Sequence, residues 1–280
     1  MRIIQSVGWR EIRHIVYKEH EKRFLSNDSS LVESNTRAPV FFWGNNKNII
    51  VEAIHRHIDA LFGKNAEYKL ESRNYLPTFA QFTETELTME HTNDSSSIGE
   101  YFSEMPVQKH VLIRYGDLLS LPLNSKFYNI QVLEIQFCYW MATELLSNFS
   151  GRVACLTYGI CKESSAIVRF LKRWKHEKSF PTLETFALHI KWSSFEHEMI
   201  KKEIGIKSYP DSIILSNANQ SLPPEKNPGF FLRTFFDFEV STYIVRDDGI
   251  IADLLIDEDS MFFSVKKCAE KQMVERGYNP

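Results

Sequence analysis

The sequence has little cysteine and no long apolar run. It contains four cysteines in 280 residues, Cys138, Cys155, Cys161 and Cys268, with no Cys-x-x-Cys spacing among them. This pattern is typical of buried, reduced thiols and excludes a disulfide scaffold. No segment approaches the roughly 18 uncharged apolar residues of a membrane span, and the N-terminal segment lacks the apolar centre of a signal peptide. We therefore expect a cytoplasmic or nuclear protein with no membrane partner.

Glycine and proline are also scarce, at 11 and 10 residues, which excludes collagen-like and linker-rich chains. The net charge of −3 excludes the basic excess of a dedicated nucleic-acid binder, so a nucleic-acid partner is not expected. Aromatic residues, in contrast, are abundant: 21 Phe, 11 Tyr and 5 Trp. Six of them lie between Phe230 and Tyr243. We expect most of these six to cap the end of a sheet, with Phe230, Phe231 and Phe235 as the candidate partner surface.

The apolar residues that are present alternate between strand and helix periodicity. Strands are predicted over 38–43, 82–90, 110–116, 129–137, 152–160 and 182–190, and helices over 48–63, 140–149, 162–178 and 195–205. Residues 91–100 are predicted as a loop. Corresponding strand positions at Ile113, Leu133, Leu156 and Phe186 are spaced by about 20 to 30 residues, which brackets the leucine-rich-repeat period. Parallel strands with helices on one side are the natural packing of such units.

The two ends of the chain differ from this centre. Residues 1–37 are predicted as a short helix, with Trp9, Ile12, Val16 and Phe24 as an apolar stripe, followed by a polar loop. After a loop at 216–229, apolar runs flank Asp248-Gly249, which indicates an antiparallel hairpin or meander. Residues 266–280 form a polar tail. The predicted fold class is α/β, with irregular leucine-rich-repeat-like strand–helix units and a C-terminal antiparallel hairpin or meander.

A search for catalytic and metal-binding motifs gives negative results. The sequence has no phosphate-binding loop, dinucleotide fingerprint or nucleophile elbow. His55 and His57 are two residues apart in a predicted helix and cannot share one metal ion. The acidic segment that starts at Asp247 fails the calcium-loop pattern because Gly249 and Ile251 occupy its third and fifth positions. We expect no catalytic residue, no cofactor and no metal.

Two alternatives of other classes stay open. The first is an enzyme with an unusual site, for which the C-terminal acidic hairpin together with His189 and His197 are the candidates. The second is an RNA-binding protein that uses the basic helix 172–178, where Lys172, Arg173 and Lys175 surround Trp174. Because Trp174 continues the apolar stripe of that helix, a core position is the more ordinary interpretation.

Three ordered motifs resemble a known family. The helix signature FLKxW is matched by Phe170, Leu171, Lys172 and Trp174. The signature of the next strand is matched by Leu183, Glu184 and Ile190, with Phe186 in place of an aliphatic residue. A terminal YxIxRxDGxxA segment is matched by Tyr243, Ile244, Arg246, Asp248, Gly249 and Ala252. Together they resemble the F-box-associated domain, type 2, of nematode (Caenorhabditis-type) F-box proteins. The resemblance covers about 38–265 and is strongest over 130–190.

The resemblance implies a non-enzymatic protein-binding module, the substrate-recognition part of a ubiquitin-ligase adaptor. In that family an N-terminal F-box binds the Skp subunit of a cullin ligase, and the associated domain holds an unknown protein substrate. Leu-Pro, which opens an F-box, occurs here at 76–77, 121–122 and 222–223, and residues 1–37 contain no recognisable F-box. We therefore expect Skp–cullin binding only if an F-box lies upstream, and a truncated or degenerate paralogue without ligase recruitment is the alternative.

Overall fold

The computed structural model describes about two thirds of the chain. The described residues are 2–7, 11–19, 39–42, 52–53, 56–57, 60, 67–73, 76, 82–88, 95–114, 121–137, 141–159, 164–190, 194–209 and 241–275. The described part contains no helix long and apolar enough to cross a membrane. Residues 52–60 include five helical positions, in agreement with the helix predicted over 48–63.

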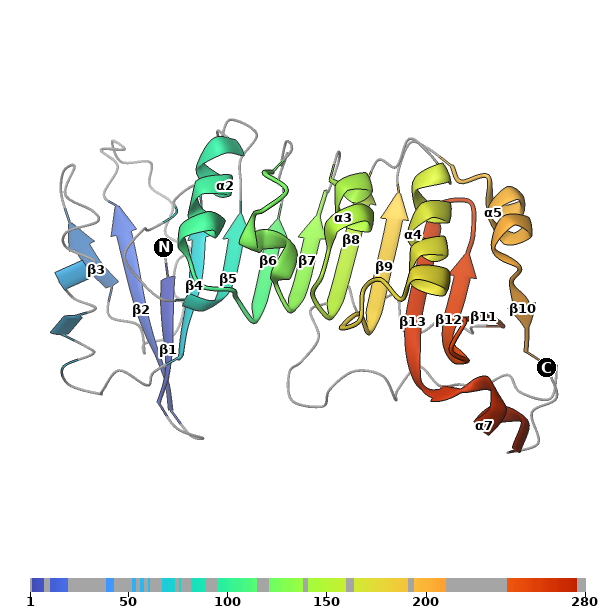
Figure 1. Cartoon of the computed structure of the whole chain (residues 1–280). Coiled ribbons are helices and arrows are strands. Elements are labelled where there is room, and N and C mark those ends of the chain that lie inside the picture. Colours follow the sequence, from blue (N-terminus) through green and yellow to red (C-terminus); the bar gives the residue numbers. More distant parts are fainter. Residues whose placement is uncertain are drawn as a thin grey trace, which may run out of the picture.

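One large mixed sheet organises these residues (Figure 1). Its thirteen strands are arranged in the order β10-β11-β12-β13-β9-β8-β7-β6-β5-β4-β1-β2-β3. The strands are β1 (Arg2–Val7), β2 (Glu11–Glu19), β3 (Pro39–Phe42), β4 (Glu67–Arg73), β5 (Phe82–Thr88), β6 (His110–Arg114), β7 (Val132–Gln136), β8 (Val153–Gly159), β9 (Thr185–Ile190), β10 (Lys207–Ser208), β11 (Thr242–Val245), β12 (Ile250–Ile256) and β13 (Ser260–Ala269). The ten strands β4–β13 carry an α/β fold of parallel strand–helix units followed by an antiparallel meander, which confirms the predicted class at this level.

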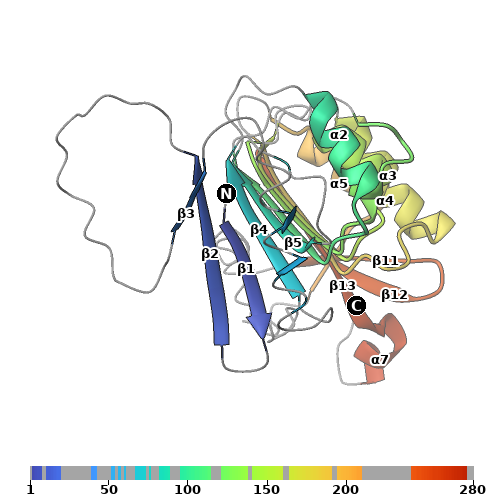
Figure 2. The ribbon, with the colours of Figure 1, turned by 90° about the vertical axis from the view of Figure 1, so that its left-hand side faces the viewer.

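Strands β4 to β9 are parallel neighbours. Helical segments connect or follow them: α2 (Ser95–Glu104), the 3-10 turn η2 (Lys126–Asn129), α3 (Ala142–Asn148), α4 (Ser164–Glu177) and α5 (His197–Ile204). Figure 2 shows α2, α3, α4 and α5 together on one face of the sheet. Right-handed crossovers between parallel neighbours place successive helices on the same side, so the fold forms strand–helix units.

The main core lies between the sheet and this helix layer. A row of register partners crosses the sheet beneath the helices, with Val111, Leu133, Ala154, Phe186 and Phe263 fully buried. Helix α4 places Phe170 and Trp174 against the same row, where both rings contact Phe263. Apolar residues at every second strand position and at i, i+4 on the helix produce this contact.

The C-terminal part is an antiparallel meander. Strand β13 pairs with β9, and β12, β11 and β10 follow outward. The turn between β11 and β12 contains Gly249, whose φ of 86° lies in the left-handed region that favours glycine. The chain then continues from β13 into α7 (Glu270–Glu275), within the predicted polar tail.

The helix predicted within residues 1–37 is wrong. Residues 2–7 and 11–19 are strands β1 and β2, which form an antiparallel hairpin, and β1 also pairs with β4. Ile3, Ile4, Ile15 and Val16 are β-branched residues, which favour strands.

Two further predictions need correction. Part of the predicted loop 91–100 belongs to α2, where Ile98, Tyr101 and Phe102 are buried at helical spacing. The four strand positions predicted to correspond, Ile113, Leu133, Leu156 and Phe186, all face the core, but they are not register partners of one another across the sheet. Ile113 pairs with Ile135, and Leu156 pairs with Leu188. A shift of two residues keeps the same face of a strand, so apolar alternation alone does not distinguish the two registers.

Candidate functional site

Most family-motif residues are structural. Phe170, Leu171 and Trp174 of α4, Leu183 before β9, and Tyr243 of β11 are all buried, with exposed fractions of 4% or less. Their side chains contribute to the packing of the sheet against the helices. A partner that binds the folded chain does not reach these five side chains.

The remaining motif residues join two segments that are distant in sequence. Arg246 follows β11, and its guanidinium lies over the Trp174 ring of α4, 5.3 Å from the ring centroid. Its Nε atom donates to Oδ1 of Asp248 at 2.9 Å, and the same carboxyl oxygen accepts from the backbone N–H of Ile250. The Arg246 donor holds the pKa of Asp248 below its ordinary value. We call Trp174, Arg246 and Asp248 the motif junction.

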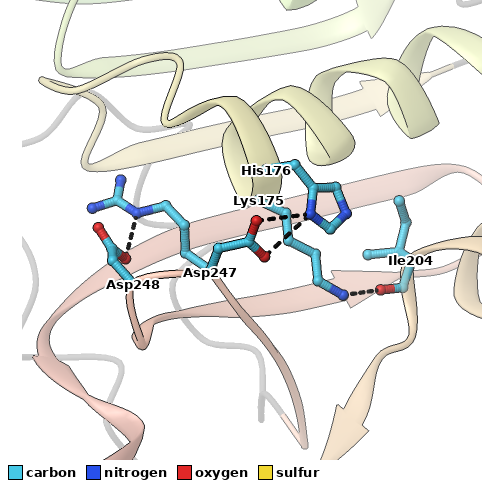
Figure 3. Close-up of polar contacts among 6 residues, drawn as sticks. Lys175, His176, Ile204, Asp247 and Asp248 are labelled. Carbon is cyan, nitrogen blue, oxygen red and sulfur yellow. Dashed lines mark hydrogen bonds and ion pairs between the residues drawn. The ribbon is translucent and has the colours of Figure 1, made fainter.

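Figure 3 shows the polar contacts around this junction. His176 of α4 and Asp247 of the turn point toward each other, with Nδ1 3.1 Å from both carboxyl oxygens. Lys175 donates from Nζ to the carbonyl oxygen of Ile204 at the end of α5, at 2.7 Å. The end of α4 is thus attached to both the β11–β12 turn and α5. This geometry makes the junction a structural connection.

Cationic side chains of the basic helix considered for RNA binding form contacts with other parts of the chain. Lys172 pairs with Glu203 of α5 at 2.6 Å. Arg173 donates to the carbonyl oxygen of Ser147 at 2.6 Å and lies over the Phe180 ring. Phosphate binding by this helix would compete with these contacts, so the structure does not favour the RNA alternative.

The titratable residues considered for an enzyme do not converge. His189 lies 3.7 Å from Asp259, whereas His197 lies 3.3 Å from its neighbour Glu198. Among the described residues no three His, Cys, Asp or Glu side chains are grouped as metal ligands. Burial, and secondly the charge of Glu134, raise the pKa of the Cys155 thiol well above its ordinary value, which opposes formation of a nucleophilic thiolate.

The face of the sheet opposite the helices carries a different set of side chains. One row of register partners there includes Glu86, Leu112, Glu134, Cys155 and Ala187, and continues to Phe262 and Leu255. We call this side the opposite face. Val153, Cys155, Ala187 and Phe262 form a small apolar cluster on it. Polar and charged residues follow on the β5–β7 side of this cluster.

A buried acid–histidine pair lies on the opposite face. Oε1 of Glu134 is 3.0 Å from Nε2 of His110 on the neighbouring strand β6. The side chain of Glu134 is 3% exposed and that of His110 is 24% exposed. Oε2 of Glu134 has no hydrogen-bond partner within the described part of the chain. A buried carboxylate oxygen that no protein group satisfies is costly unless water or a ligand binds it.

The carboxyl ends of β7 and β8 carry two stacked aromatic residues. Phe137 and Tyr158 both have positive φ values, 61° and 53°, and their rings stack with centroids 4.7 Å apart. His189, at the end of β9, makes an edge contact with Tyr158 at 5.6 Å. Non-glycine residues with positive φ are uncommon and occur often at binding sites, and ligands of α/β sheets bind at the carboxyl ends of parallel strands.

Apart from His189, a candidate of the enzyme alternative, the sequence analysis did not single out these residues as a site. The available signal was polar residues at every second position of an otherwise apolar strand, namely Glu134 and Gln136 in β7. The predicted partner surface, Phe230, Phe231 and Phe235, lies outside the described residues.

Comparisons with known proteins give no relative. No family model, no curated protein and no solved structure matches the chain.

Proposed function

We propose that this chain is a protein-binding module and that the opposite face of its sheet is the binding surface. The fold of parallel strands with helices on one face supports this proposal. Solenoid and repeat proteins of such construction bind partners on the extended surface formed by their strands. In the finer description that we propose, the strand–helix units are leucine-rich-repeat-like and irregular.

The observation that carries the proposal is the chemistry of the opposite face. It combines the half-buried apolar residues Val132 and Leu255 with the partly exposed His110 and with buried polar groups that have no hydrogen-bond partner among the described residues. An apolar surface with a few convergent polar groups is typical of a binding site. The ordered motifs of α4, β9 and β11 further support the proposal that the chain is related to F-box-associated domains and has their substrate-recognition role.

Ligase recruitment is a separate matter within this proposal. Residues 1–37 contain no F-box motif, and the described part of them forms strands β1 and β2 of the sheet. We therefore expect no binding of the Skp subunit by these 280 residues. A stable complex in a pull-down with purified Skp would contradict that expectation.

The binding surface is tested by substitution and cross-linking. The full chain is used as bait, captured proteins are cross-linked, and the linked residues are mapped by mass spectrometry. Val132→Glu places a charge on the opposite face. Leu123→Glu is the matched control, because Leu123 is 78% exposed in the loop that packs beside α2.

We expect Val132→Glu to abolish capture while thermal unfolding shows an intact fold, and Leu123→Glu to leave capture unchanged. Cross-links should fall on the opposite face. Cross-links on α2–α5, or capture that is lost with Leu123→Glu and kept with Val132→Glu, would contradict the proposed surface.

A further inference from the structure

Three aromatic side chains follow one another across the carboxyl ends of the parallel strands β7, β8 and β9. Phe137 directly follows β7, and Tyr158 and His189 are the penultimate residues of β8 and β9. The Phe137 and Tyr158 rings stack with centroids 4.7 Å apart, and the His189 ring is nearly perpendicular to Tyr158 at 5.6 Å. We call these three residues the aromatic row. All three are half-buried, and the side chain of His189 is 33% exposed, so a partner can reach the row from solvent.

A β-bulge gives Tyr158 its position in the row. The register between β8 and β9 shifts by one residue between Leu156 and Gly159, so two residues of β8 stand opposite the single residue His189. His189 comes two residues after Ala187 and therefore lies on the opposite face. Strict alternation would place Tyr158 on the helix side, whereas the bulge brings its ring into contact with His189. Bulges that redirect a side chain in this way are common beside functional sites.

The backbone conformation supports the same interpretation. Phe137 and Tyr158 have φ values of 61° and 53°, in the left-handed region that bulky residues rarely adopt. Of the other described residues with this conformation, Phe180 is buried in the main core, where its ring contacts Phe170. Phe137 and Tyr158 instead hold their rings at a partly exposed end of the sheet. Residues in such costly conformations concentrate at binding sites.

Negative charge lies beside the aromatic row. Oδ2 of Asp259 is 3.7 Å from Nε2 of His189, and the side chain of Asp259 is 59% exposed. Asp257 and Glu258, in the same turn between β12 and β13, are also exposed. The backbone N–H of Ile190 donates to the carbonyl oxygen of Asp259 at 2.7 Å, which attaches this turn to the end of β9. A ligand that complements this end of the sheet carries positive charge.

Aromatic rings next to an exposed carboxylate select a particular cation. The guanidinium of arginine is planar and weakly hydrated, stacks on aromatic rings and forms strong hydrogen bonds with carboxylates. The ammonium of lysine is compact and strongly hydrated, and it does not stack. A phosphate or nucleic acid is repelled by the exposed acidic side chains of the turn.

We propose that the aromatic row and Asp259 bind an arginine side chain of the partner protein, with its guanidinium against the rings and hydrogen-bonded to the carboxylate. This inference rests on the proposed function and names the residue type that the partner presents at this end of the opposite face. The site does not depend on a cavity, because a guanidinium stacks on partly exposed rings at a protein surface. Arginine and aromatic residues are also the side chains most enriched at the energetic centres of protein interfaces.

Small probes test the proposal on the full chain. Nα-acetyl-arginine amide and its neutral isostere Nα-acetyl-citrulline amide are titrated into the protein, and binding is followed by ligand-observed NMR. Methyl β-glucoside is included because sugars also stack on aromatic rings. We expect a millimolar dissociation constant for the arginine amide, as suits a ligand of this size, about fivefold weaker binding of the citrulline amide, and no binding of the glucoside.

Substitutions in the row locate the binding. Tyr158→Leu removes a ring and keeps an apolar side chain, so the arginine amide should bind about fivefold more weakly. Phe137→Leu makes the same change on β7 and replaces the first variant if that one does not unfold cooperatively. Asp259→Asn removes only the charge, and it should reduce the preference for arginine over citrulline by about twofold or more.

A second aromatic pair provides the matched control. Tyr209 stacks on Tyr243 with centroids 4.6 Å apart and donates to Asp253, so it too lies beside a carboxylate. That carboxylate is already paired with Lys266 at 2.7 Å. Tyr209→Leu should therefore leave the binding of all the probes unchanged.

The outcomes separate this inference from the proposed function. If the arginine amide binds no better than the citrulline amide, or equally well to the variants of the aromatic row, or if only the glucoside binds, the inference is wrong. If capture of protein partners still depends on Val132 in that case, the proposed function stands without it. Capture that is unaffected by both Val132→Glu and Tyr158→Leu would overturn both.

Discussion

The guanidinium of Arg246 lies over the indole ring of Trp174, with Cζ 5.3 Å from the ring centroid. This contact connects the end of α4 to the turn between β11 and β12, about 70 residues later in the chain. Trp174 is fully buried, and its other ring contact is an edge-on packing with Phe263 at 5.1 Å. Arg246 thus covers one side of a core aromatic residue.

The Arg246–Trp174 contact predicts an energetic coupling. In a double-mutant cycle of Arg246→Gln and Trp174→Phe, we expect the two losses of unfolding free energy to be non-additive by about 0.5–1 kcal/mol. Urea denaturation of the four proteins measures this. Arg246→Gln combined with Leu145→Ala in α3 is the control, and its effects should add. Full additivity in the Trp174 cycle would mean that the contact contributes nothing.

The turn carboxylate Asp248 predicts a pH dependence. Its pKa is lowered in the folded state, chiefly by the Arg246 hydrogen bond, so its stabilising effect is present above about pH 4 and is lost as the pH falls through the lowered value. Asp248→Asn should reduce stability at pH 7 by less than about 1 kcal/mol, as for other exposed pairs, and should make no difference near pH 2. Urea denaturation at both pH values checks this. An equal loss at both would mean that the charge of the carboxylate does not cause the effect.

Gly151 predicts a steric requirement. A Cβ atom at this position would lie 1.8 Å from the carbonyl oxygen of Ile130 and 2.5 Å from Cζ of Phe149. Gly151→Ala should therefore lower the free energy of unfolding by about 3 kcal/mol or more. In Gly99→Ala, within α2, the new Cβ lies 3.4 Å from Leu121, and the gain in helix propensity should keep the change within about 1 kcal/mol. Similar losses in thermal unfolding of both variants would contradict the steric explanation.

The unbonded carboxyl oxygen of Glu134 predicts a stabilising substitution. Glu134→Gln removes a buried charge and keeps an acceptor for His110, so the free energy of unfolding should rise by about 1 kcal/mol. Glu184→Gln is the control, because Glu184 accepts from Nε and Nη2 of Arg152 at 2.9–3.2 Å and should lose about 0.5–1 kcal/mol. Chemical denaturation gives both values. A marked loss with Glu134→Gln would show that the carboxylate has a structural role.

Much of the central fold follows from local sequence. The helix α4 is predicted because Ile167, Phe170, Leu171 and Trp174 share one face at helical spacing, and the structure buries all four. The β11–β12 turn is predicted because Asp248-Gly249 separates two apolar runs. Both signals depend on residues that are close together in the chain.

The errors arise where partners are distant in sequence. The segment 11–19 has apolar residues at both helix and strand spacings, and its pairing with β1 and β3 decides for a strand. Ile113 aligns with Ile135 because the sheet register, set by all the strands together, overrides the local similarity between segments.

The sequence by itself determined that this chain forms strand–helix units followed by an antiparallel meander, since backbone periodicity and turn residues act over a few positions. The tertiary structure alone decided that Glu134, Gln136 and Thr157 meet on one face and that Arg246 covers Trp174. Residues on neighbouring strands or on a packed helix and turn become close only after the chain is folded, and a one-residue change of register would turn each strand side chain to the other face. The candidate binding site depends on that register.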